Sequence, residues 1–186
     1  MIMISVPGIV AKRWSKATRK WAEDKRGLAI VEFALVAGPF FFLIFGLLEI
    51  CMVFIMTSVM EYGAAEASRL IRTGQFHERD VVDEEQFRNE ICDNAFGMLP
   101  CDSGKIRVDI SRFTNFSGVT SSSPITNGNY DSSNFGMDIG NGGDIILVRV
   151  FYEWSLITPV LSRPLANVGN DKRLLQATVV FRNEPF

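Results

Sequence analysis

One residue that could have a chemical function is a carboxylate in an apolar segment. Glu32 is one of only two acidic side chains between Leu28 and Met60, a stretch of 33 residues without a basic side chain. A carboxylate near hydrocarbon is costly and usually has a functional partner. If the chain were cut after Gly27, the new α-ammonium group of Leu28 would lie about one helical turn from Glu32. That ammonium could pair with Glu32 of its own chain or of a neighbour, and pairing between chains would set the stagger of packed helices. The alternative is that Glu32 lies at the headgroup boundary and extends its carboxylate to water.

Cysteine and histidine residues are the next candidates. Cys92 and Cys101 are nine positions apart in the part of the chain that we expect outside the membrane, where thiols are oxidised, so we predict a disulfide between them. Cys51 falls within the apolar segment and is expected to be a buried thiol. The chain's single histidine, His77, has no Cys or His at ligand spacing and is expected to be an exposed linker residue. We therefore expect no zinc site and no cofactor.

Catalytic and nucleic-acid-binding signatures are missing from the sequence. There is no G-x-S-x-G, Walker A or HExxH motif. The neighbouring Glu84 and Glu85 are better explained as the solvated start of a helix, where the helix dipole favours negative charge. The acidic residues between 114 and 144 follow no EF-hand template. The chain has 19 Lys and Arg against 21 Asp and Glu, and 47% hydrophobic residues, which is not the composition of a nucleic-acid-coating protein. We expect no enzyme activity, no bound metal and no nucleic-acid partner.

The element that must position Glu32 is a membrane-spanning helix. About 20 apolar residues, at roughly 1.5 Å each, cross a hydrocarbon core of about 30 Å, so Leu28–Met60 is long enough. A core helix of a soluble domain seldom stays apolar on every face over such a length. Residues 1–27 contain seven basic and two acidic side chains, whereas the rest of the chain is acidic overall. The positive-inside rule therefore predicts a cytoplasmic N-terminus and places everything after about Met60 outside.

The basic arm and the apolar helix also restrict how the N-terminus could be processed. A secretory signal peptide has an apolar core of about 7 to 15 residues, less than half of the present one. A lipoprotein signal at Cys51 would need small residues where Glu49 and Ile50 stand. Cleavage on the cytoplasmic side, before the apolar segment, fits better and would leave the helix attached to the mature protein.

Several residues along this helix have features of helix packing. Ala34 and Gly38 form a small-xxx-small pair that lets another helix approach closely. Pro39 cannot donate a backbone hydrogen bond, so we expect a kink or local unwinding there. Glu49 lies roughly 32 Å of helix beyond Leu28, and two interpretations remain open. It marks the outer boundary of the span, followed by an amphipathic stalk packed on the external domain, or it is buried within a deeper span against a partner.

A short amphipathic helix is expected next in the external part of the chain. Asp83 has the position of its N-cap, with Gln86 three residues later as in a capping box, and Pro100 is expected to end it. Its apolar stripe consists of Phe87, Ile91, Ala95 and Met98. We expect this helix to lie across a sheet.

Alternating apolar residues then predict three strands, at 106–111, 146–154 and 175–181. The sheet is expected to be antiparallel, which makes the external part a small α+β domain with one short helix on three strands. Residues 114–144 are rich in Ser, Gly and Asn, and such a long loop is usually functional or mobile. The predicted organisation is a basic leader at 1–27, a transmembrane and stalk helix at 28–74, and an external domain at 75–186.

The residues around the apolar helix resemble those of pilin-like proteins. In Lys25–Phe33, Gly27 precedes Leu28, and Glu32 would be the fifth residue after a cut between them, which is similar to the leader junction of a type IV prepilin. A dedicated membrane peptidase cuts such leaders after Gly. Further features complete the pattern: Gly38-Pro39, Glu49, the small-residue segment Gly63–Arg69 and Arg72-Thr73-Gly74. Together they resemble the TadE-like family of pseudopilins, minor components of the tight-adherence (Tad or Flp) pilus machinery. The final residues, 180–186, are similar to the closing segment common in that family.

This resemblance implies a function in pilus assembly. A prepilin peptidase would remove the leader, and Gly27, Leu28 and Glu32 would be the processing and assembly residues. The implied partners are the membrane, other pilins or pseudopilins and the assembly platform, in a hetero-oligomer. The implied location is a bacterial inner membrane with the C-terminal domain in the periplasm, and the sequence leaves open whether the protein enters the extracellular pilus or stays at its base. A different class of function is a signal-anchored periplasmic binding or sensor module that does not polymerise and keeps its basic arm.

Overall fold

The computed structural model describes residues 27–79, 83–101, 104–158 and 164–186. The predicted leader, apart from Gly27, lies outside these residues. The chain divides into two compact units, with the boundary between Phe45 and Gly46. The N-terminal unit contains the first part of a long helix. The C-terminal unit contains the rest of that helix together with a small α+β domain.

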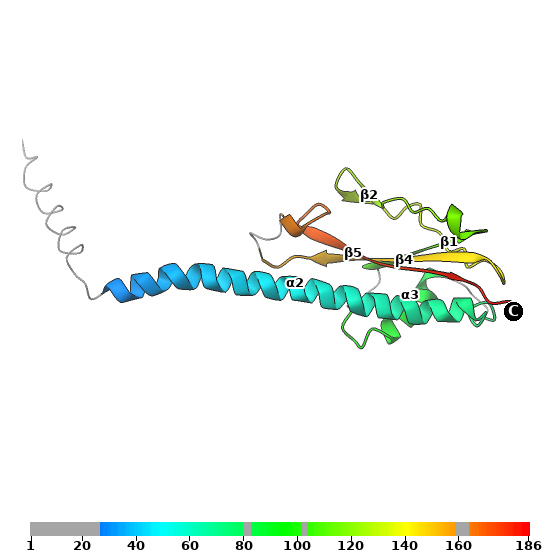
Figure 1. Cartoon of the computed structure of the whole chain (residues 1–186), viewed down its shortest axis with the longest axis horizontal. Helices are drawn as coiled ribbons and strands as arrows, with labels where there is room; N and C mark the ends of the chain where they lie inside the picture. Colours follow the sequence, from blue (N-terminus) through cyan, green and yellow to red (C-terminus); the bar gives the residue numbers. More distant parts are fainter. Residues whose placement is uncertain (1–26, 80–82, 102–103, 159–163) are drawn as a thin grey trace, which may run out of the picture. The chain divides into compact units, whose positions relative to one another are not determined.

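Helix α2 spans Leu28–Arg72 and is the longest element among the described residues (Figure 1). It continues through Pro39, so of the two effects expected at this residue local unwinding does not occur, and the kink stays a prediction. Proline removes one backbone hydrogen bond, and the bonds of the flanking turns are enough to keep the helix continuous. After α2 ends, Gly74 has a φ of +81°, a region that favours glycine. A Cβ atom on Gly74 would lie 2.7 Å from Cγ of Phe186, so a side chain has no room there.

In the N-terminal unit, α2 exposes most of its apolar side chains. More than half of the surface of Ile30, Phe33, Leu35 and Val36 is accessible. Among the described residues, α2 is the one helix long and apolar enough to cross a membrane, and 17% of its apolar window is buried inside the molecule. A core helix of a soluble protein would be mostly buried. The exposed apolar surface therefore supports single-pass anchoring in a membrane.

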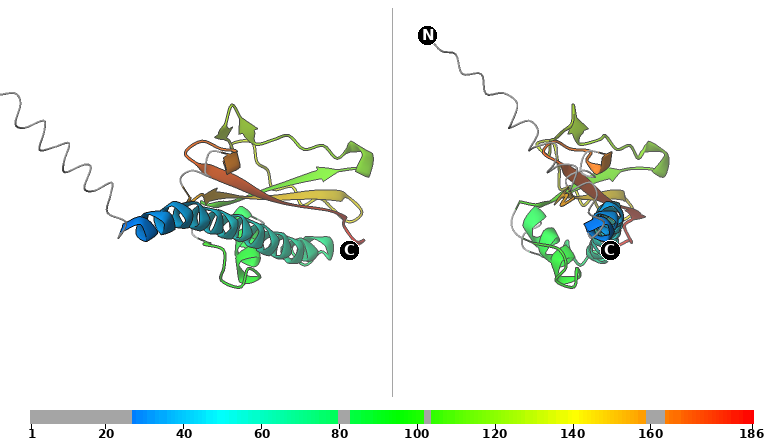
Figure 2. Two further views of the ribbon diagram at one scale, coloured as in Figure 1. Left: turned by 60° about the vertical axis from the view of Figure 1, so that its left-hand side comes forward. Right: turned by 90° about the vertical axis from the view of Figure 1, so that its left-hand side faces the viewer.

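In the C-terminal unit, the rest of α2 has one buried face. Its buried apolar residues recur every three or four positions, the spacing of one helical face. They are Met56, Met60, Ala64, Ala67 and Ile71, with Val59 beside them. This face packs on a three-stranded sheet, and α3 covers the same side of the sheet (Figures 1 and 2).

The sheet consists of β1 (Ile106–Phe113), β4 (Ile145–Ser155) and β5 (Lys172–Arg182), in the order β1-β4-β5. Both pairings are antiparallel, and Val148 is the partner of Ile110 on one side and of Val179 on the other. The alternate residues of β4 that face the helices are buried, as the period-2 pattern of the sequence predicted. The predicted α+β fold with a long apolar helix and an antiparallel three-stranded sheet is confirmed.

Helix α3 spans Glu84–Asp93 and begins as predicted. The side chain of Asp83 accepts a hydrogen bond from the backbone N–H of Gln86 (2.8 Å), which confirms the N-cap. The helix ends earlier than expected, at Asp93 rather than next to Pro100, because the chain turns after Asn94 into positive φ at Phe96 and Gly97. The apolar stripe is correspondingly shorter than predicted. Phe87, Ile91 and Ala95 are fully buried, whereas Met98 lies beyond the helix and is 43% exposed.

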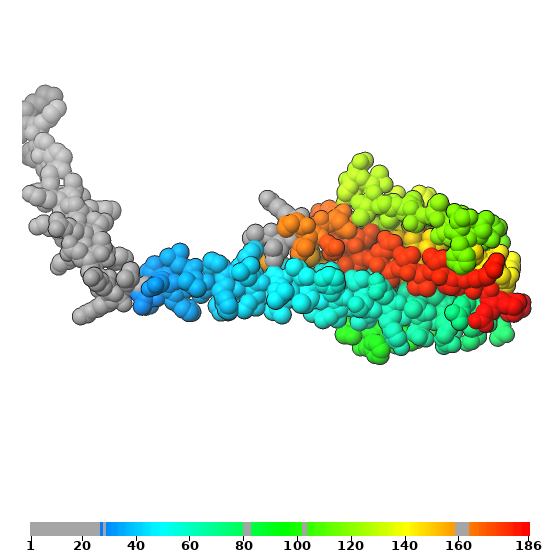
Figure 3. All heavy atoms as spheres, viewed as in Figure 1, coloured from blue at the N-terminus to red at the C-terminus, as the bar shows by residue number. Residues whose placement is uncertain are grey.

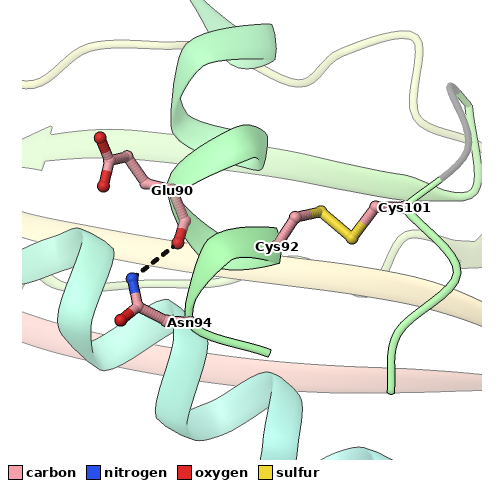
Figure 4. Close-up of a disulfide and its surroundings, with 4 residues drawn as sticks. All are labelled: Glu90, Cys92, Asn94 and Cys101. Atoms are coloured by element: carbon pink, nitrogen blue, oxygen red, sulfur yellow. Dashed lines mark hydrogen bonds between the residues drawn. A yellow bond between two sulfur atoms is a disulfide. The ribbon is translucent and has the colours of Figure 1, made fainter. Parts of the chain in front are cut away.

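A disulfide joins the end of α3 to the following chain. The Sγ atoms of Cys92 and Cys101 are bonded, and their Cα atoms are 6.0 Å apart (Figure 4). Asn94 donates from Nδ2 to the carbonyl oxygen of Glu90 (2.8 Å), which satisfies one of the last carbonyl groups of the helix. The two links together hold the turn after α3 against the helix.

The long segment between β1 and β4 folds over the outer face of the sheet, opposite the helices (Figure 2). It contains the short helix η2 (Phe116–Gly118) and a two-stranded hairpin of β2 (Ile125–Thr126) and β3 (Asn129–Tyr130). Phe151 of β4 lies against two rings of this segment, with centroid distances of 5.1 Å to Phe135 and 6.2 Å to Tyr130. The segment is therefore packed on the domain through specific side chains.

A buried ion pair holds the same segment in place. The guanidinium of Arg149 donates to Oδ2 of Asp109 from both Nε (3.0 Å) and Nη2 (2.5 Å), and from Nη1 to the carbonyl oxygen of Ser122 (2.6 Å). The second carboxylate oxygen of Asp109 accepts from the N–H of Gly136 (3.0 Å). Each group of the pair thus contacts the loop as well as its partner on the neighbouring strand, as buried charges require.

Three other side chains differ from what the sequence suggested. Cys51 is exposed on α2 instead of buried, because the buried face of the helix is set by residues three and four positions apart. His77 is partly buried. Its Nε2 lies 2.7 Å from the carbonyl oxygen of Gly140, and its ring lies 4.6 Å from that of Phe186. Glu84 is not simply solvated, since its Oε1 accepts a hydrogen bond from the backbone of β1.

Candidate assembly site on the N-terminal helix

The predicted cleavage junction lies at the very start of the described chain. Gly27 is the residue before α2 and is exposed, and apart from the adjacent residues of the chain no atom lies within 4 Å of the position that a Cβ would take. The backbone there is accessible from outside the molecule. A protease that cuts after Gly27 would meet no steric barrier from the described part of its own chain.

Glu32 lies on the first turns of α2, with its carboxylate exposed and surrounded along the helix by apolar residues. Within the described residues it makes no hydrogen bond and no ion pair. Glu32 is four positions after Leu28 and therefore lies about one helical turn from the start of the helix. The only charge that cleavage would add within that turn is an α-ammonium on Leu28. The arrangement can therefore accept a cation from the same helix end or from a neighbouring chain.

The small-residue pair Ala34 and Gly38 is also accessible. Both residues are exposed, and apart from the adjacent residues and backbone of the same helix no atom lies within 4 Å of the Cβ position of Gly38. Pro39 follows on the exposed surface of the same unit. A second helix could approach the backbone closely at these residues, because they carry little or no side chain.

Glu49 has a partner in its own chain. Its side chain is only 6% exposed. Its two carboxylate oxygens accept backbone hydrogen bonds from Ile157 and from Thr158, the second at 3.0 Å, in the segment that follows β4. Two N–H donors satisfy the carboxylate without a basic residue. This position agrees with the interpretation in which Glu49 marks the outer end of the span and the stalk after it packs on the external domain.

Sequence reasoning singled out Glu49 and missed its partners. Ile157 and Thr158 are 108 and 109 positions away along the chain, and both contribute backbone atoms. A backbone donor leaves no residue-type signal in a sequence. The available signal was indirect, since a carboxylate in an apolar run requires some partner.

Comparison with known proteins concerns this same helix. The family model described as TadE-like protein matches residues 27–69. Residues 27–69 form a TadE-like segment. The resemblance inferred from the sequence is therefore confirmed over these residues, which are less than half of the chain and include Gly27, Glu32 and Glu49. No curated protein and no solved structure matches the chain.

The TadE-like segment supports a coarse functional class. It is consistent with a pilin-like membrane protein that is associated with components of the Tad pilus. The segment contains the exposed helix of the N-terminal unit and the first turns that pack on the external domain. The candidate site is thus the part of the chain with both an apolar exposed surface and a family match.

Proposed function

We propose that this protein is a minor pilin or pseudopilin that takes part in the assembly of a tight-adherence pilus after a prepilin peptidase cuts between Gly27 and Leu28. The observation that carries the proposal is the coincidence of two boundaries. The TadE-like match begins at Gly27, which is also where the basic arm gives way to α2. A leader that ends at this point leaves the whole helix on the mature protein.

Glu32, which is exposed and has no partner among the described residues, supplies the assembly step of the proposal. A carboxylate that enters hydrocarbon must be neutralised or paired, and cleavage creates a cation one helical turn away. Pairing with the α-ammonium of a neighbouring chain would fix the axial stagger of two α2 helices, and the open Ala34 and Gly38 would let the backbones approach. The helix is then the assembly element, and the external domain contacts other subunits in a hetero-oligomer.

Orientation and chemistry follow from the same proposal. The basic arm stays in the cytoplasm with the peptidase, and the disulfide-bonded domain lies in the periplasm, where thiols oxidise. The proposed role is structural, without catalysis, bound metal or cofactor. It requires other pilins or pseudopilins and an assembly platform as partners.

The test separates processing from assembly. In cells that make the pilus, Glu32→Ala should leave leader removal intact, seen as an unchanged gel mobility of the mature protein, and should strongly reduce the number of pili. Glu61→Ala is the matched control, because Glu61 is an exposed glutamate farther along the same helix. Equal pilus numbers for Glu32→Ala and the wild type would refute the pairing. A chain that keeps its basic arm in such cells would instead be a signal-anchored binding or sensor module.

A further inference from the structure

The two edges of the sheet differ in how their backbone groups are satisfied. β1 is one edge, and its outward groups are occupied in the middle of the strand, at Val108 and Ile110. The N–H of Val108 donates to Oε1 of Glu84 (3.1 Å). The N–H of Ile110 donates to the carbonyl oxygen of Gly136 (2.8 Å), and its own carbonyl accepts from the N–H of Asp138 (3.0 Å). Proteins commonly protect an edge strand by covering it in this way.

The other edge, β5, is occupied by described residues only at its ends. At the start, the N–H of Leu174 donates to Oδ1 of Asn167 (2.7 Å). Just past the strand, the N–H of Glu184 donates to the carbonyl oxygen of Arg72 (2.9 Å). Both residues have even numbers, and outward groups alternate along a strand. The same alternation places the backbone groups of the even-numbered residues between them on the outer edge.

These intervening residues have no covering segment among the described residues. They are Gln176, Thr178, Val180 and Arg182, and each side chain is exposed. Apart from an isolated bridge between Val168 and Lys172 at its start, the strand pairs only with β4 within the described chain. In the space-filling view, β5 lies at the surface between the long loop and α2 (Figure 3). An open edge of this length without a proline is a template for another strand.

Two separate hollows lie between α2 and β5, one near each end of the open edge. Near the start of β5, a hollow of about 400 Å³ is lined mainly by apolar side chains, including Val53, Phe54 and Leu174. Near its end, a second hollow of about 300 Å³ lies between Ser68 of α2 and Val180 of β5. Ser68 is only 2% exposed, and its hydroxyl has no hydrogen-bond partner among the described residues. The two hollows thus offer space for apolar side chains beside the backbone edge, and a buried hydroxyl lies next to the second one.

The basic side chains along this edge favour an acidic binding partner. Arg69 and Arg72 beside the second hollow have side chains that are 55% and 50% exposed, and Arg182 ends the strand. The ion pairs of Arg69 with Glu66 and of Arg72 with Glu184 are at the surface, where such pairs are weak. A second copy of β5 would bring like charges together, which is unfavourable. An acidic segment would be attracted instead.

We propose that the edge of β5 binds an extended acidic segment of another protein, which adds to the sheet as a fourth strand. Its backbone would pair with Gln176, Thr178 and Val180, and its apolar side chains would enter the two hollows. Its acidic residues would lie against Arg69 and Arg72. This binding site is separate from the helix-based assembly proposed above and does not depend on leader cleavage.

The probe for the test is a fluorescein-labelled synthetic peptide of nine residues, with alternating Val and Thr between two Asp at each end. The counterpart has Lys in place of Asp. Fluorescence polarisation with the full chain in detergent micelles should show that the acidic peptide binds about tenfold more tightly than the basic one, since each surface charge pair contributes a factor of about 2 to 5. Equal affinity for the two peptides would overturn the proposal. Binding that disappears because β5 edges pair in a concentration-dependent dimer would also overturn it.

Substitutions test whether the acidic peptide binds at the edge of β5. Arg69→Glu should lower the affinity for the acidic peptide about fivefold. Lys105→Glu makes the same change of charge at an exposed lysine beside β1 and should leave this affinity unchanged. Thr178→Pro removes one outward N–H and should weaken binding about tenfold. Circular dichroism shows whether this variant folds, and if it does not, Arg69→Glu against Lys105→Glu still decides. Equal effects of those two substitutions would contradict binding at this edge.

Discussion

Replacing Glu49 by glutamine tests whether this carboxylate holds the external domain to α2. The substitution keeps the shape of the side chain but exchanges one acceptor oxygen for an NH2 group. In the structure the two oxygens accept from the N–H groups of Ile157 and Thr158. Glutamine can satisfy one of these donors and places a donor against the other. A hydrogen bond to a charged group contributes about 1.5 to 3 kcal/mol, so the loss of one contact should cost about 2 kcal/mol.

The direct assay is hydrogen–deuterium exchange of the full chain in lipid nanodiscs. A loss of about 2 kcal/mol in local stability corresponds to about thirtyfold faster exchange, because 1.4 kcal/mol is a factor of ten. The acceleration should be confined to the amides of Ile157 and Thr158 and their immediate neighbours. Glu61→Gln is the control, since it makes the same change at an exposed position of the same helix.

Two results would refute this reasoning. Unchanged exchange at residues 157 and 158 in Glu49→Gln would mean that the carboxylate does not hold these amides. Equal acceleration by Glu61→Gln would mean that any loss of charge on α2 has the same effect. Either outcome would remove the basis for placing Glu49 at the outer end of the span.

Other predictions concern the external domain, and urea unfolding followed by tryptophan fluorescence checks the first two. Arg149→Met leaves Asp109 buried without its cation and should destabilise the domain by about 3 to 5 kcal/mol. The double variant Arg149→Met with Asp109→Leu should recover much of that stability, because no unpaired charge is then buried. Equal loss of stability in the single and the double variant would contradict the ion-pair explanation. Replacing Cys92 and Cys101 by serine opens a short loop and should cost about 2 to 3 kcal/mol, and a reductant should then have no further effect. Burial raises the pKa of Tyr130 above its ordinary value of 10.0, so its contribution to stability is complete below pH 10 and decreases as the pH rises through the folded-state pKa. Stability measured from pH 9 to 11 should therefore fall less steeply in Tyr130→Phe than in the wild type, and identical slopes would refute this.

The sequence predicted the parts of the fold that rest on local patterns. The apolar run identified α2, the carboxylate of Asp83 identified the start of α3, and alternation along β4 identified its buried face. The end of α3 was missed because Pro100 is a strong helix breaker, whereas the chain actually turns at Phe96 and Gly97 in positive φ. A phenylalanine with positive φ carries no recognisable signal in the sequence.

Contacts between segments that are distant in the sequence could not be predicted. Nothing in the sequence shows that the loop covers Arg149 of β4 and that the carbonyl oxygen of Ser122 accepts a hydrogen bond from it. His77 was expected to be exposed, and it instead contacts Gly140, 63 positions away. In the candidate site, Glu32 and the Gly27–Leu28 junction were found because their signal is local, while the backbone N–H groups that bind Glu49 leave no residue-type signal.

The identity of the mature N-terminus tests the central claim most directly. Intact-mass spectrometry of the protein, purified from the membranes of cells that possess a prepilin peptidase, should give a chain that begins at Leu28. Cells without the peptidase should give a chain that still contains Lys12–Arg26. A mature chain that retains these residues in the presence of the peptidase would contradict the account.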